Sequence, residues 1–368
     1  MEPFKNVYNR EFVGRLGEGL KDANPAFDRD GFLDAVFAGD WENRELKDRM
    51  RHISRTMGVF LPADFPQAVG IVRRAAPVLN GQSFAAMVLP DFVEVHGQSH
   101  WEESMAALEQ LTQQSSAEFA IRPFLIQNLE RGMAQMLEWT GHENEHVRRL
   151  ASEGCRPRLP WGMGVPALKR DPAPILPVLE QLRADESEYV RRSVANNLND
   201  IAKDHPELVV DILREWGEDE SKETGKLIRH ALRGLLKKGH PAALDLMGLG
   251  AVPHVEVLGL RVNESVISIG DSMSFEFELF NSGDNSANVM VDYVIGFVLA
   301  RGKIGQKVFK LSKFALGAGE RRVVRKSHSF RPITTRVYYP GVHSVAVQVN
   351  GVIGEAVEFD LVIDSCSN

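Results

Sequence analysis

A loop with an unusual composition occupies residues 155–168, which read CRPRLPWGMGVPAL. Its prolines restrict the backbone, and it carries Arg156, Arg158 and Trp161. A rigid loop that presents guanidinium groups and an indole ring suits recognition of a planar cationic or aromatic ligand, because an aromatic face attracts cations. The alternative is that Trp161 fills a gap between packed helices, which is the commoner role of tryptophan.

A second group of polar residues falls on a predicted helix at residues 187–205, ended by Pro206. Arg192, Asn196 and Asp200 are spaced by four and lie roughly on one face of this helix. An apolar stripe at helical spacing occupies the opposite face: Val190, Val194, Leu198 and Ile201. The helix is therefore predicted to bury one face and to present small, specific polar groups on the other.

The pattern of this helix recurs in residues 146–154, HVRRLASEG, and in residues 227–236, LIRHALRGLL. Two successive positions correspond in the three segments: Val147, Val190 and Ile228, followed by Arg148, Arg191 and Arg229. An interval of about 40 residues is typical of HEAT-type helical hairpins. Such repeats stack into a curved solenoid, so we expect a concave wall lined by one helix per repeat, with the arginines near it.

Glu118 stands near the start of another helical segment, residues 115–139. Ser115 or Ser116 can cap a helix there, and a carboxylate in the first turn suits the helix dipole. Arg122, four residues on, could pair with Glu118. Pro123 interrupts the pattern, so the alternative is that Glu118 is held on a short turn before the longer helix.

The rest of the N-terminal half is also predicted to be helical, apart from residues 84–97, FAAMVLPDFVEVHG. Pro90 and Gly97 favour a helix end followed by a loop in that segment. From Val255 onward the pattern changes to alternating strands, about seven over the remaining length, as in an immunoglobulin-type β-sandwich. We expect two domains, residues 1–250 and 255–368, with a linker at residues 248–254.

The chain has 368 residues, 43% of them hydrophobic and 25% charged, as expected for a globular protein. Two cysteines are too few for a disulfide framework, and the histidines lack zinc-site spacing, so no metal or cofactor is expected. The N-terminal segment lacks signal-peptide zones and no apolar run reaches the length of a membrane span. These features favour a cytoplasmic location and no membrane contact.

The net charge of −7 conceals a band of cations in the second domain. Residues 301–336 contain eleven Lys or Arg side chains and one acidic side chain, Glu320. A band of this density suits contact with a polyanion, but it also suits a solvated sheet face. Charge alone leaves the two interpretations open.

Two motifs resemble a known family. HVRRLASEGCRPRLPW and EYVRRSVANNLNDIAKDHPE are similar to segments of the HEAT-like repeat alkylpurine DNA glycosylases, specifically the AlkC branch. The resemblance covers roughly residues 5–250, and some AlkC members also carry an immunoglobulin-like tail. It implies an enzyme that cleaves the N-glycosidic bond of cationic alkylated bases, such as 3-methyladenine and 3-methylcytosine, in double-stranded DNA without flipping the base.

The resemblance also implies roles for individual residues. Glu118 would be the catalytic carboxylate that stabilises an oxocarbenium-like sugar, and Trp161 the aromatic contact. Asp200 is a second acidic candidate, with Glu153 as a rival. Candidate DNA ligands lie on the repeats and in the cationic band: Arg148, Arg149, Arg156, Arg158, Arg192, Asn196, Asn197, Arg229, Arg321, Arg322, Arg325 and Lys326.

Two other functions remain open at this stage. A non-enzymatic HEAT scaffold that binds proteins would have an apolar or acidic concave wall, and the doubled arginines disfavour it. A DNA-binding protein that senses damage would need to lose only one positioned group from an enzyme of this kind. Because a solenoid can grip DNA alone, we expect a monomer.

Overall fold

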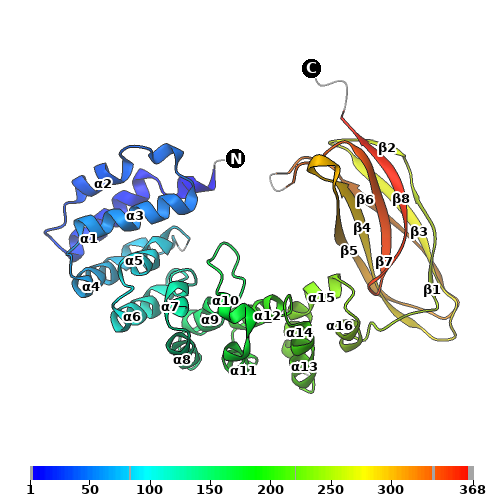
Figure 1. The fold of residues 1–368 in the computed structure, drawn as a ribbon, viewed down its shortest axis with the longest axis horizontal. Coiled ribbons are helices and arrows are strands. Elements are labelled where there is room, and N and C mark those ends of the chain that lie inside the picture. Colours follow the sequence, from blue (N-terminus) through cyan, green and yellow to red (C-terminus); the bar gives the residue numbers. More distant parts are fainter. Residues whose placement is uncertain (1–2, 83, 220, 334–335, 364–368) are drawn as a thin grey trace. The chain divides into compact units, whose positions relative to one another are not determined.

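The structure is a computed structural model that describes residues 3–82, 84–219, 221–333 and 336–363. Packing divides the chain into two compact units. One comprises Met1–His205 and Trp216–Ala231, and the other comprises Pro206–Glu215 and Leu232–Asn368. The predicted fold class is confirmed: helical repeats come first and a β-sandwich follows (Figure 1).

The helices of the first compact unit stack against one another in a row, and the remaining helices belong mainly to the second unit (Figure 1). Their bounds are α1 (Arg10–Ala23), α2 (Arg29–Phe37), α3 (Leu46–Phe60), α4 (Phe65–Ala75), α5 (Val88–His96), α6 (Trp101–Thr112), α7 (Arg122–Gln127), α8 (Leu129–Trp139), α9 (Glu145–Gly154), α10 (Pro166–Arg170), α11 (Leu176–Leu182), α12 (Glu188–Ile201), α13 (Pro206–Trp216), α14 (Lys222–Ala231), α15 (Arg233–Lys237) and α16 (Pro241–Leu246).

The repeat pattern seen in the sequence corresponds to three helices packed side by side. Helix α12 contacts α9 on one side and α14 on the other. The equivalent residues Val147, Val190 and Ile228 are all buried. Helix α9 begins at a side-chain cap, because Asn144 accepts a hydrogen bond from the backbone N–H of His146 at 2.9 Å. The buried apolar residues therefore hold the three helices together. The arginines next to them in the sequence consequently take equivalent places on successive helices.

The expectation of a helix end and loop at residues 84–97 is wrong, because α5 spans Val88–His96. Pro90 is the third residue of that helix. The first turn of a helix tolerates proline, since its N–H groups have no partner within the helix. The buried side chains of Leu89, Phe92 and Val93 hold the helix against its neighbours.

The β-sandwich consists of two sheets, with strand orders β1-β3-β6 and β2-β8-β7-β4-β5. Its core is rich in aromatic rings, among them Phe275, Phe277 and Phe330. About seven strands were expected, and the one missed, β2, is only three residues long. The bounds are β1 (Val255–Val262), β2 (Val266–Ser268), β3 (Ser272–Asn281), β4 (Ala287–Val298), β5 (Ile304–Leu316), β6 (Arg321–Ser329), β7 (Gly341–Val349) and β8 (Val352–Val362).

The short helices α15 and α16 belong to the same compact unit as the strands. Asn350 in the turn between β7 and β8 donates to the carbonyl of Gly250 at 3.0 Å. Beside it, Gly239 and Gly351 bring their backbones together, so that a Cβ on Gly351 would lie 2.3 Å from the Gly239 Cα. The domain boundary predicted at residues 250–255 therefore stays a prediction. The compact unit that contains the strands begins earlier than this boundary, since it includes the chain from Leu232 onward.

The contact between Gly239 and Gly351 should be visible in stability. Gly351 has φ +82° and Gly319 has φ +68°, but nothing lies within 4 Å of a Cβ on Gly319. Gly319→Ala should cost about 1 kcal/mol for the left-handed backbone alone. Gly351→Ala should cost clearly more, because two backbones must also separate. Urea unfolding followed by circular dichroism checks this, and equal losses would contradict the close approach.

Candidate functional site

Glu118 lies in the turn between α6 and α7, as the interruption at Pro123 indicated. Its Oε2 accepts hydrogen bonds from Arg149 Nη1 at 2.7 Å and from Ser116 Oγ at 2.7 Å. The pairing with Arg122 that the sequence allowed does not form, since Arg122 begins α7 and donates to backbone carbonyls. With its side chain 16% exposed, Glu118 is oriented both by Arg149 of α9 and by Ser116 of its own turn.

Arg149 on α9 links Glu118 to a second acid. Its Nη2 lies 3.6 Å from Glu153 Oε1, and its guanidinium carbon lies 4.8 Å from the centre of the Tyr189 ring. Burial by itself lowers the pKa of Arg149, but the carboxylates of Glu153 and Glu118 raise that pKa above its usual value. The arginine is therefore held charged between two acids.

Glu153, Arg156 and Asp200 form a buried ion-pair cluster, with exposed fractions of 4%, 6% and 1%. Arg156 lies 2.5 Å from Glu153 and 2.8 Å from Asp200, and Lys203 lies 2.7 Å from the other oxygen of Asp200. Ser193 donates to Glu153 at 2.6 Å. The sequence predicted that the polar face of α12 would be exposed. At Asp200 this face is buried, because Arg156 from the adjoining loop covers it.

Trp161 lies near the tip of the loop between α9 and α10 and is 67% exposed. The alternative in which it fills a gap between helices is therefore wrong. Lys47 of α3 donates to the Trp161 carbonyl at 2.7 Å, and the same ammonium lies 4.6 Å from the centre of the Phe119 ring. Because Phe119 follows Glu118, the Trp161 loop lies beside the turn that carries the carboxylate.

Several predicted DNA ligands make contacts within the helical unit. Arg148 is buried and pairs with Asp185 at 2.6 Å. Arg158 is paired with Asp204 at 2.7 Å, and its hydrogen bonds with Asp204 raise the Arg158 pKa. Asn197 is fully buried and donates to the carbonyl of Ser152 at 2.8 Å. These three side chains connect neighbouring repeats, and their contact with DNA stays a prediction.

The exposed cations of the repeats include Arg192 on α12 and Arg229 on α14. Arg192 has a side chain that is 67% exposed, and Arg229 is also exposed. Asn196 makes a hydrogen bond of 2.9 Å with His230. A cleft of about 170 Å³ between these helices is lined by Glu188, Arg191, Arg192, Ala195, Glu223, Lys226, Leu227 and His230.

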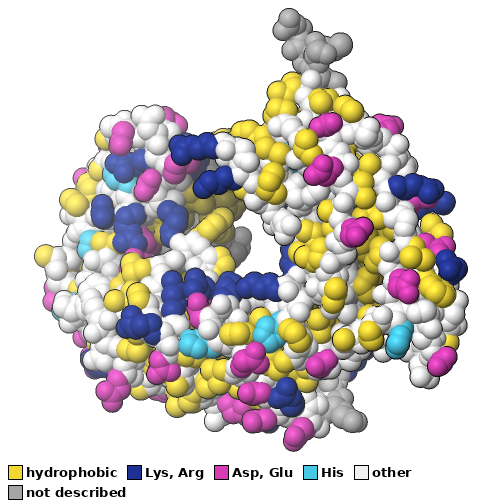
Figure 2. Space-filling view, turned by 45° about the vertical axis from the view of Figure 1, so that its right-hand side comes forward, with side chains coloured by type: hydrophobic (Ala, Val, Ile, Leu, Met, Phe, Trp, Pro, Cys, Tyr) yellow, Lys and Arg dark blue, Asp and Glu magenta, His cyan; other side chains and the backbone are white. Residues whose placement is uncertain are grey.

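Sequence reasoning missed the placement of His230 and Lys226 in this cleft. The signal for His230 was present, since Arg149, Arg192 and His230 hold the same position in successive repeats. In the space-filling view, Lys and Arg side chains form dense groups over the helical repeats, whereas the sandwich surface mixes all types (Figure 2).

The cationic band of the sandwich is partly neutralised by its own sheet. Strand β6 pairs with β3, and this register sets Arg325 opposite Glu276. Arg325 and Glu276 are 3.0 Å apart, and Arg321 pairs with Glu278 on the same strand. The other two predicted DNA ligands of this band are placed differently. The Arg322 side chain pairs with Glu320 at 3.0 Å, and Lys326 is exposed.

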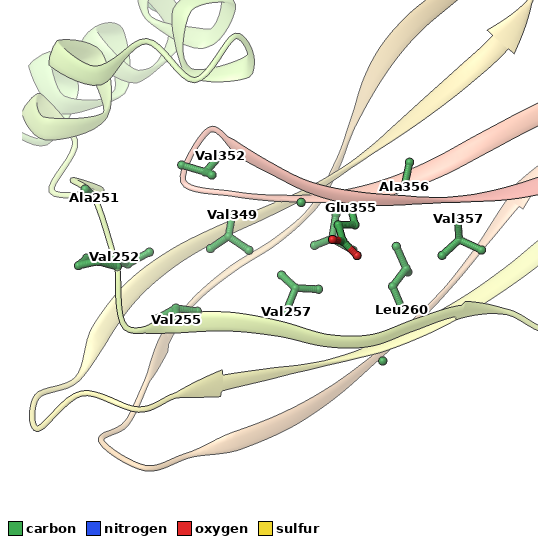
Figure 3. A pocket seen from close by; sticks show the side chains of 14 residues that line it. Ala251, Val252, Val255, Val257, Leu260, Val349, Val352, Glu355, Ala356 and Val357 are labelled. Atoms are coloured by element: carbon green, nitrogen blue, oxygen red, sulfur yellow. The ribbon is translucent and has the colours of Figure 1, made fainter.

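A groove of about 730 Å³ lies in the sandwich between β1 and the β7–β8 hairpin (Figure 3). Its lining is almost wholly apolar, and Glu355 is the one charged residue among the lining residues. It offers no cation to a phosphate. Within the described ranges, no three His, Cys, Asp or Glu side chains are grouped so that they could hold a metal ion. No helix described is long and apolar enough to cross a bilayer.

Comparisons with known proteins agree in both halves of the chain. A family model described as DNA alkylation repair enzyme matches residues 82–235, and a model for the C-terminal Ig-like domain of uncharacterised protein YhaZ matches residues 256–363. The chain is 43% identical over 361 residues to uncharacterized protein YhaZ of Bacillus subtilis (strain 168), covering 98% of this chain and 100% of the relative.

A solved structure matches the chain over the same extent. It is the Pseudomonas fluorescens alkylpurine DNA glycosylase AlkC bound to DNA containing an abasic site analogue. The TM-score is 0.94 at 41% sequence identity, with 98% of this chain and 100% of the other covered. The likeness therefore includes both the helical repeats and the sandwich.

The two arginines of the loop should differ sharply in their effect on stability. Arg156→Met leaves Glu153 and Asp200 buried without their shared cation and should cost about 3 kcal/mol. Arg158→Met removes an exposed pair with Asp204 and should change stability little. Urea unfolding of both variants measures the difference, and an Arg156→Met protein as stable as Arg158→Met would contradict the buried cluster.

Proposed function

The chain belongs to the AlkC branch of the HEAT-like repeat alkylpurine DNA glycosylases, and from this premise we propose that it hydrolyses the N-glycosidic bond of cationic alkylated bases in double-stranded DNA. The observation that carries the proposal is the pairing of an oriented carboxylate, Glu118, with an exposed aromatic ring, Trp161, on adjoining segments. The solved relative with DNA bound supports it.

The chemistry that this site can supply fits a lesion such as 3-methyladenine or 3-methylcytosine. A base that already carries positive charge leaves without being protonated, so the site needs no general acid. Positive charge then develops on the deoxyribose, and a fixed carboxylate stabilises it electrostatically. Within the described residues both donors to Glu118 reach Oε2, which leaves Oε1 for the sugar or for an attacking water.

Trp161 would meet the lesion from the side of the duplex. Because the ring is exposed on a loop, we assign it contact with the cationic base or sugar without extrusion of the base. Glu118 ranks ahead of Asp200, since Asp200 is 1% exposed and bound by two cations. Glu153 also ranks behind Glu118, because Arg156 and Ser193 already occupy its oxygens.

We assign the exposed cations of the repeats to the phosphates. Arg192, Arg229 and Lys226 are exposed on α12 and α14, and Asn196 lies among them. Phosphate contacts fix the register of the protein on the duplex but do not read sequence. Arg148, Arg156, Arg158 and Asn197 would then act mainly by holding the repeats that carry these cations.

The first experiment measures release of free 3-methyladenine from methylated duplex DNA. Glu118→Gln keeps the size and the hydrogen bonds of the side chain but loses its charge, so excision should fall by about a hundredfold or more while DNA binding persists. Glu130→Gln, at an exposed position on α8, is the matched control and should excise normally. Asp200→Asn, measured in parallel, ranks the second acid.

The outcomes separate the competing functions. Full activity of Glu118→Gln removes this residue from the mechanism. A wild-type protein that binds damaged DNA tightly but releases no base is a damage sensor. A protein that neither binds DNA nor releases a base is a scaffold of the HEAT type.

The sandwich should contribute to binding through the cations of β6. Replacing Arg321, Arg322, Arg325 and Lys326 by Gln should weaken binding to all sequences and reduce the slope of log K against log salt. The opposite change is expected for Glu276→Gln with Glu278→Gln, which frees the charges of Arg325 and Arg321. Unchanged slopes in both proteins, measured by fluorescence anisotropy, would mean that this face does not meet DNA.

A further inference from the structure

The tip of the Trp161 loop is fixed through its backbone. Trp161 has φ +62°, in the left-handed region that residues other than glycine seldom adopt. Lys47 donates to the carbonyl of Trp161 at 2.7 Å, and Arg122 donates through Nε to the carbonyl of Met163. The two donors come from α3 and α7 and act on either side of Gly162. Two cations therefore clamp the three-residue tip.

Arg122 is an unusual residue to find at this place. It is fully buried, and besides Met163 it donates to the carbonyl of Gly154, at the end of α9, at 2.8 Å. The pKa of Arg122 is lowered to about 10, chiefly by burial and also by the Arg156 charge, although Cys155 and Asp200 oppose this shift. A guanidinium buried against carbonyls instead of a carboxylate is costly, so a specific benefit is expected. The benefit visible here is that one side chain ties the root of the loop to its tip.

Lys47 connects the loop tip to the turn that carries the carboxylate. Its ammonium lies on the face of Phe119, next to Glu118, at 4.6 Å from the ring centre. The charge of Lys47 also lowers the pKa of the buried Asp91 carboxyl, against the larger effect of burial, which raises it. The Lys47 ammonium thus lies on the Phe119 ring and donates its hydrogen bond to the Trp161 carbonyl.

We propose that Lys47 and Arg122 are positioning residues that set the direction of the Trp161 ring beside Glu118. An indole that is 67% exposed has too little packing to fix its own direction, so its backbone must do so. The two donors supply that constraint by holding the carbonyls on each side of Gly162. The role rests on the proposed function, in which Trp161 meets the lesion.

The orientation itself is tested without any reaction. The full-length protein is labelled with 5-fluorotryptophan at its five Trp positions, and Trp161→Phe assigns the Trp161 signal in the ¹⁹F spectrum. Lys47→Met should shift or broaden this signal while those of Trp101, Trp139 and Trp216 stay. Lys21→Met, at an exposed position on α1, is the matched control and should change none. An unchanged Trp161 signal in Lys47→Met overturns the clamp.

The consequence for catalysis is tested with a double-mutant cycle under single-turnover conditions. Lys47→Met should lower the rate of 3-methyladenine excision about tenfold, with DNA affinity nearly unchanged, because the ring is misplaced and not lost. In the Trp161→Ala background the same change should have no further effect. An equal loss in both backgrounds overturns the positioning role.

Arg122 gives a second, independent arm. Arg122→Lys keeps a buried donor and should retain more excision than Arg122→Met; equal rates in two folded variants would count against the hydrogen bonds. If Arg122→Met fails to fold, the Lys47 variants still decide the matter. If Trp161→Ala excises as fast as the wild type, the role of Trp161 in the proposed function fails, and the ¹⁹F signal then reports on the clamp alone.

Discussion

A row of alternating charges connects the helical repeats at their centre. It runs from Glu118 through Arg149, Glu153 and Arg156 to Asp200, with neighbours 2.5–3.6 Å apart. Four of these residues come from the turn before α7, from α9 and from the loop after it, and the fifth comes from α12. Each cation is shared by two acids, so the displacement of any member weakens the pairing of a buried neighbour. The geometry of the repeats depends on this row.

The arrangement fixes one acid at the edge of the row and buries the others. Glu118 ends the row at the turn, beside the loop of Trp161, whereas Asp200 lies inside it. Holding a charged carboxylate in a partly buried place lowers the stability of the fold. In return, the carboxylate is already oriented when charge develops in the reaction, so that water need not reorient. A positioned carboxylate of this kind suits a reaction in which positive charge moves from a base to a sugar. The rigid loop supplies the aromatic partner for the same charge.

The sandwich follows a different logic. Its aromatic core is closed by the two sheets, and its outer face pairs cations of β6 with acids of β3. Arg321 and Arg325 are both held in this way, so the face presents ordered guanidinium groups with reduced net charge. Ordered cations on a face of modest net charge favour short-range contacts with phosphate groups. They contribute less to long-range electrostatic attraction, which salt screens.

The sequence by itself determined the fold class, because helical and alternating periodicity depend only on local spacing. It also indicated the family, through two motifs, and it offered the turn at Glu118, through Pro123, as one of two alternatives. Only the tertiary structure decided that Asp200 is buried, that Trp161 is exposed and that Arg148 braces two repeats. Periodicity tells which side chains share a face, whereas the partner of a charge depends on which distant segment packs against that face. Ion-pair partners and the exposure of a loop therefore follow from packing across repeats, which no local pattern encodes.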